Sequence, residues 1–202
     1  MNRREFNKYI LASGIGLFLP KSVFSNMVIG NYYGSSGTDT WYGFSNTDGG
    51  PDSNPTDEYG VALDRTMAMN YNPSVSGTVL AVNAHFRSVN FGGELWLVVY
   101  RGTTLIGKSA DISGSADDDD WTDDITIVAE GGQSLNYTSA DTQIRYGCSW
   151  EGGGSPKIGY DSSEGTTMYY SQSAISGAPP ATIVWEDPSA TQGPGFILKV
   201  SE

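Results

Sequence analysis

The sequence contains very little cysteine, histidine or positive charge. Its 202 residues include one cysteine and one histidine, and 11 lysines and arginines stand against 23 aspartates and glutamates. One cysteine cannot form a disulfide framework within the chain, and these residues are too few for a Cys/His zinc site. The formal net charge of −12 argues against nucleic acid as a partner, because phosphates repel an acidic surface.

Motifs of common enzymes are also lacking. The chain has no GxSxG, HExxH, GxGxxG or P-loop pattern, and a Ser-His-Asp triad would have to use His85. Carboxylate pairs could support glycoside hydrolysis, with Glu94 and Glu186 beside tryptophans, but no pattern selects them. We therefore expect a non-catalytic protein, with a glycoside hydrolase as the enzymatic alternative.

The first 25 residues differ from the rest of the chain. A basic head precedes the apolar stretch Tyr9–Leu19, which is too short to span a membrane as a helix. The segment Asn2–Lys8, with the sequence NRREFNK, resembles the twin-arginine export signal and departs from it at Asn7, where leucine is usual. The resemblance implies a signal peptide over 1–25, removed before Asn26, and an exported protein of the periplasm, cell surface or exterior without a membrane span after cleavage. An uncleaved apolar N-terminus is the alternative.

From residue 64 onwards, apolar and polar residues alternate with the period of two that is typical of β-strands. We expect strands near 67–71, 79–88, 125–127, 144–150 and 196–200, and shorter ones at 157–160, 167–171 and 182–185. Leu95–Tyr100 is apolar throughout, which indicates a central strand covered on both faces. The pattern predicts an all-β fold, an antiparallel, jelly-roll-like β-sandwich over 64–202, after an irregular arm over 26–63 rich in glycine, asparagine and aromatic residues.

The succession of strands along the chain between about residues 60 and 185 resembles that of extracellular jelly-roll modules. The resemblance is carried by Asp64-Arg65, Ser76–Val79, Glu94–Tyr100, Leu105–Ser109 and Trp121. Such modules occur in carbohydrate-binding domains, adhesins and phage fibres, so the resemblance implies a binding or structural role outside the cell.

An acidic segment places six aspartates within eight residues. Like charges this close repel one another unless cations or solvent relieve them. Calcium prefers several carboxylate oxygens, although the spacing does not match an EF-hand. The sequence therefore leaves two alternatives, a solvated loop or a Ca²⁺ site whose ligands would be Asp117, Asp118, Asp119, Asp120, Asp123 and Asp124.

Aromatic and polar side chains together suggest a carbohydrate ligand, because sugar rings stack on aromatic faces and sugar hydroxyls need hydrogen-bond partners. We place Trp96 and Trp121 in the core and expect the stacking residues among Trp41, Tyr42, Trp150, Tyr160, Tyr169 and Trp185. The polar face of the strand 79–88 offers Asn83, His85 and Arg87, so we expect His85 to lie outside the core. Cys148 should point inward as a small hydrophobic residue.

These patterns favour an exported module that binds a polysaccharide or glycan without catalysis, with Ca²⁺ as the candidate cofactor. The alternative is a structural subunit of a surface filament, matrix or virion-like appendage. Such a subunit would assemble with other copies of itself by adding a strand from the arm over 26–63 to a neighbouring sheet edge.

Overall fold

The computed structural model describes residues 39–44, 55, 57–60, 65–89, 91–154, 156–161, 168–171, 173, 175–186 and 193–202. These residues belong to one compact unit that begins at Gly37. The strands among them pair antiparallel, and these ranges contain no helix, so the all-β prediction is confirmed. The signal peptide expected over 1–25 lies outside the described residues.

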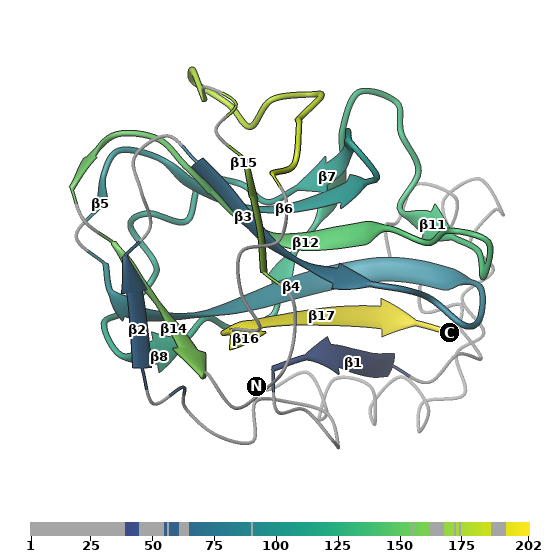
Figure 1. The fold of residues 1–202 in the computed structure, drawn as a ribbon, viewed down its shortest axis with the longest axis horizontal. Coiled ribbons are helices and arrows are strands. Elements are labelled where there is room, and N and C mark those ends of the chain that lie inside the picture. Colours follow the sequence, from purple (N-terminus) through teal and green to yellow (C-terminus); the bar gives the residue numbers. More distant parts are fainter. Residues whose placement is uncertain are drawn as a thin grey trace, which may run out of the picture. The chain divides into compact units, whose positions relative to one another are not determined.

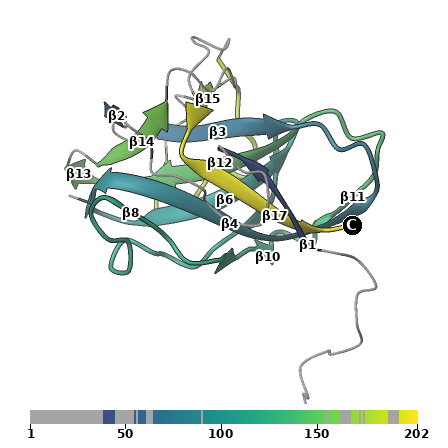
Figure 2. The ribbon, with the colours of Figure 1, turned by 90° about the horizontal axis from the view of Figure 1, so that it is seen from below.

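The larger sheet has nine strands arranged around the long strand β4 (Gly77–Ser88). Its main order is β1 (Asp39–Gly43), β17 (Phe196–Ser201), β4, β14 (Lys157–Asp161) and β16 (Gly193–Pro194). The short strands β8 (Asp120–Trp121), β9 (Ile125–Thr126) and β11 (Asn136–Tyr137) also pair with β4, and β2 (Asp57–Gly60) pairs with β14. Figures 1 and 2 both show β17 lying along β4.

The second sheet has six strands and packs against the first. Its order is β10 (Val128–Ala129), β7 (Thr104–Lys108), β6 (Leu95–Arg101), β12 (Ile144–Trp150), β3 (Arg65–Tyr71) and β15 (Met168–Ser171). A small separate pair joins β5 (Phe91–Gly92) to β13 (Gly153–Gly154). The chain changes sheet between β3 and β4, between β4 and β6, and between β12 and β14, which is the connectivity expected of a jelly-roll-like sandwich.

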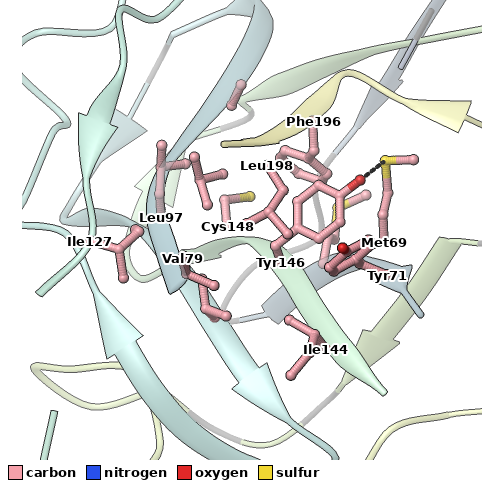
Figure 3. Close-up of a cluster of buried hydrophobic side chains, with 14 of the residues drawn as sticks. Met69, Tyr71, Val79, Leu97, Ile127, Ile144, Tyr146, Cys148, Phe196 and Leu198 are labelled. Carbon is pink, nitrogen blue, oxygen red and sulfur yellow. Dashed lines mark hydrogen bonds between the residues drawn. The ribbon is translucent and has the colours of Figure 1, made fainter. Parts of the chain in front are cut away.

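The main core lies between the two sheets, where alternate residues of each strand point inward. Figure 3 shows Tyr146 and Cys148 of β12 facing Phe196 and Leu198 of β17 across this space. Tyr146 donates its hydroxyl hydrogen to the carbonyl oxygen of Tyr42 at 3.1 Å, so its one polar group is satisfied. Cys148 is fully buried, as the alternation predicts, and burial raises the pKa of its thiol to about 12.

Strand β6 is buried on both faces, which confirms the prediction from its uniformly apolar sequence. Leu95, Leu97 and Val99 point into the main core. Trp96, Val98 and Tyr100 point the other way and form a second core beneath the segment 175–186, which supplies the side chains of Ile175, Ile183 and Trp185. This covering segment makes only an isolated bridge, Thr104 to Thr182, where the sequence predicted a strand over 182–185.

The segment expected to be an irregular arm contributes two strands to the sandwich. β1 pairs with β17, with Trp41 opposite Lys199, and β2 pairs with β14. The sandwich therefore begins earlier in the chain than the expected boundary at residue 64.

Candidate functional site

The acidic segment docks along one edge of β4. In the pairing of β8 with β4, Trp121 lies opposite His85. Thr122 fixes the turn that follows, because its amide donates to the carbonyl of Ala84 at 2.9 Å and its Oγ1 accepts from the amide of Ala84 at 3.0 Å. Two groups of residues that the sequence singled out separately, the polar face of β4 and the aspartates, thus meet on the outer face of the nine-stranded sheet.

The aspartates of this segment bind different partners. Asp119 forms an ion pair with Arg87, and Asp118 Oδ1 accepts from the amide of Val89 at 2.7 Å. Asp119 has a φ of 58°, in the left-handed region that is costly for a non-glycine residue. These contacts hold the loop in a defined conformation against β4. In the described part of the chain, no three His, Cys, Asp or Glu side chains gather closely enough to hold a metal ion, and the Ca²⁺ site stays a prediction.

An open hollow of about 650 Å³ lies on the surface where β8 meets β4. It is lined by Asn83, Asp120, Trp121, Thr122, Asp123 and Asp124. Trp121, which the sequence placed in the core, is half-buried and forms part of the wall, so that prediction is wrong. The short β8 pairs only at the margin of the sheet, which leaves the ring of Trp121 partly uncovered.

Asn83 contributes to the lining of this hollow and is only 5% exposed. Its Nδ2 donates to Asp124 Oδ1 at 3.1 Å, which fixes the orientation of the amide. Its Oδ1 is buried and has no hydrogen-bond partner. The hollow is therefore lined by the carboxylates of three aspartates, the Asn83 amide and the Thr122 hydroxyl, beside one aromatic ring.

His85 lies on the polar face of β4, as the alternation predicts, but it is fully buried there, so the expectation of an exposed side chain is wrong. Its exposed fraction is 0%, because the Trp121 ring packs against it in a T-shaped contact with ring centroids 5.3 Å apart, and the backbones of Gly159 and Gly195 pass close to it. Neither ring nitrogen has a hydrogen-bond partner, and Nε2 lies 4.0 Å from Asp119 Oδ1. Burial lowers the pKa of His85 and so favours the neutral ring, and the negative charge of Asp119 offsets part of this shift.

A lysine and a tryptophan lie next to the hollow. Lys199 donates to Asp124 Oδ2 at 2.7 Å and lies 3.3 Å from Asp39 Oδ2. Its Nζ is 4.9 Å from the centre of the Trp41 ring. The hydrogen bond to Asp124 is the main reason that the pKa of Lys199 is raised. The surface thus already holds one ammonium group between two carboxylates and an aromatic face.

The remaining aromatic candidates do not form a common surface. Trp150 is fully buried in the core and cannot stack on a ligand, so its prediction as a binding residue is wrong. Tyr42 is half-buried and donates to Glu202 Oε1 at 2.5 Å. Trp185 lies on the other sheet, with its ring 5.1 Å from the guanidinium carbon of Arg145, and Tyr160 is half-buried on β14.

No known protein family, curated protein or solved structure matches the chain. A helix long and apolar enough to cross a membrane does not occur in the part of the chain described by the structure.

Proposed function

We propose that this protein is an exported, non-catalytic β-sandwich module that binds carbohydrate in the hollow beside β8. The observation that carries the proposal is the combination, in one open hollow of about 650 Å³, of the Trp121 ring with the oxygens of Asn83 and three aspartates. A sugar ring would stack its apolar face on the indole, and its hydroxyl groups would donate to these oxygens. Export is proposed from the resemblance of Asn2–Lys8 to a twin-arginine signal.

The surroundings of the hollow support a site whose shape is set before the ligand arrives. Its wall is fixed by the backbone pairing of β8 with β4 and by the two hydrogen bonds between Thr122 and Ala84. A preorganised site loses little conformational freedom on binding, which favours affinity. The open form of the hollow suits an extended polymer, because a polysaccharide chain can lie across it without threading through an enclosed channel.

The test is a polysaccharide and glycan binding screen with the full protein, followed by the variant Trp121→Ala. We expect specific retention by the intact protein and a loss of at least about tenfold in affinity for Trp121→Ala, equal to about 1.4 kcal/mol. The matched control is Trp185→Ala, the same change on the other sheet, which should leave affinity within about twofold. Absence of retention by the intact protein, or unchanged affinity in Trp121→Ala, would contradict the proposal.

Calcium is the proposed cofactor, because the acidic segment carries six aspartates, of which Asp117, Asp118 and Asp119 do not line the hollow and leave its carboxylates to the ligand. Repeating the screen in calcium-containing buffer and with a chelator tests this part separately. We expect weaker retention when calcium is removed. Equal retention in both buffers would contradict the role of calcium and leave carbohydrate binding as the proposed function.

Assembly by strand addition is the second proposal. β1 occupies the end of the strand order in the nine-stranded sheet, and an edge strand can template pairing with another chain. Sedimentation at increasing concentration tests it: concentration-dependent assembly supports it, and a monomer at every concentration contradicts it.

A further inference from the structure

We propose that the hollow recognises a protonated amine, so that its ligand is a polysaccharide with free hexosamine residues such as glucosamine. This inference rests on the proposed carbohydrate binding and specifies the class of sugar. It follows from the hydrogen-bonding character, the charge and the aromatic wall of the hollow.

The hydrogen-bonding groups of the hollow call for a ligand rich in donors. Asn83 is 95% buried, as its exposed fraction of 5% implies, and its Nδ2 is already used by Asp124. Its Oδ1 is left as a buried acceptor without a donor. Buried acceptors are almost always paired in folded proteins, so a donor group of a ligand in the hollow would stabilise this side chain if it reached the atom. An ammonium group carries three donors and no acceptor, which matches a site of this kind.

The charge of the hollow favours the same group. Asp120, Asp123 and Asp124 all contribute to its lining. Lys199 pairs with Asp124, whereas no basic side chain in the described ranges forms an ion pair with Asp120 or Asp123. A cation placed here would gain from both carboxylates, and a uronate or another acidic sugar would be repelled.

The aromatic wall completes the match. An ammonium group is attracted to the face of a tryptophan by the negative charge on the face of its ring. The neighbouring Lys199 shows this arrangement within the protein itself, since its Nζ lies between Asp39 and Asp124 and 4.9 Å from the Trp41 ring centre. In the hollow, Trp121 and Asp123 would hold the amine of a hexosamine in a comparable way. N-acetylation would remove the charge and add a carbonyl oxygen, an acceptor facing acceptors.

The experiment compares three sets of oligomers of equal length with the full protein: β-1,4-linked glucosamine, its N-acetylated form and β-1,4-linked glucose. Binding is measured by titration calorimetry in mildly acidic buffer, in which the amines are protonated. We expect the glucosamine oligomers to bind at least tenfold more tightly than either of the others. If the acetylated or glucose oligomers bind as well or better, the amine inference is overturned while carbohydrate binding stands. If none of these oligomers binds and the wider glycan screen is also negative, both proposals fail.

A pair of charge-neutralising variants separates recognition in the hollow from general attraction to an acidic protein. Asp123→Asn changes a residue that lines the hollow, and Glu58→Gln removes one negative charge on β2, outside both that lining and the acidic segment. Both residues are exposed, so neither substitution should disturb folding. We expect Asp123→Asn to weaken binding of the glucosamine oligomers at least tenfold and Glu58→Gln to stay within twofold. Equal losses in the two variants would overturn the assignment of the amine to the hollow.

Discussion

Replacing Trp150 by alanine tests directly whether this residue belongs to the core or to a ligand surface. Trp150 ends β12, where its register partners are Arg65 on β3 and Leu95 on β6, and its exposed fraction is 0%. Truncating a fully buried tryptophan removes its apolar contacts and leaves a cavity, which typically costs about 3–5 kcal/mol. A domain of ordinary stability has only about 5–15 kcal/mol to lose, so the unfolding midpoint should fall substantially.

The assay is urea unfolding followed by far-UV circular dichroism, which does not depend on the tryptophan that is removed. The slope of free energy against urea should stay constant, because the folded chain buries nearly the same surface. Trp150→Phe is the matched control. It keeps most of the apolar volume and removes an indole N–H that has no acceptor in the structure. We therefore expect Trp150→Phe to lose only about 1–2 kcal/mol.

Two results would refute this reasoning. One is a free energy of unfolding for Trp150→Ala within about 1 kcal/mol of the wild-type value, far below the about 3–5 kcal/mol that truncation of a fully buried tryptophan typically costs. The other is a loss of carbohydrate binding in a Trp150→Phe protein that remains folded. That result would indicate that the Trp150 side chain contacts the ligand, which its full burial does not allow.

Three further predictions concern buried positions. Burial lowers the pKa of His85 below its ordinary 6.5, although the negative charges of Asp119 and Asp120 act in the opposite direction. The unfolded chain therefore binds a proton at His85 more readily than the folded chain does. The free energy of unfolding should therefore fall as the pH drops below about 6.5, and His85→Gln should show a smaller fall in the same denaturant series. A Cβ on Gly147 would lie 2.0 Å from a backbone carbonyl oxygen of β3, so Gly147→Ala should lower the free energy of unfolding by at least about 3 kcal/mol. The control is Gly114→Ala, whose Cβ would meet nothing within 4 Å and which should match the wild type in thermal melts. Cys148 is buried with a raised pKa, so a thiol reagent should label it only after denaturant is added, and rapid labelling of the native protein would contradict its position.

Local periodicity was sufficient to predict β3, β4, β6, β12, β14, β15 and β17 and the two-sided burial of β6, but it did not predict β1, β2 or the short β8. The same alternation also predicts the burial of Trp150, because Trp150 points to the same side of β12 as Cys148 and Tyr146, and all three side chains are buried. The prediction for Trp150 was wrong because residue type was given more weight than this alternation. Parity along the strand is therefore the pattern that could have identified Trp150 as a core residue.

The sequence could not show what covers the outer face of β4. His85 and Asn83 do lie on the face that the alternation assigns to them, but β8 and the backbone at Gly195 cover that face locally. Such contacts join residues far apart in the chain, and a period-two pattern contains no information about them. The meeting of the aspartates with Asn83, which forms the hollow, was missed for the same reason.

The pairing of β1 with β17 has a consequence for the order of events during synthesis. Asp39 lies opposite Ser201, so the first described strand of the sandwich has its only described partner in the last one. During synthesis on the ribosome, β1 emerges early and remains without its partner strand until β17 has been synthesised. The edge of β4 that pairs with β17 also remains open until then. Open strand edges invite association with other chains, so this interval is when a nascent molecule is most exposed to aggregation. When β17 pairs with β1 and β4, it covers the open edges of both strands together. A chain that ended before β17 would leave both of these edges unpaired.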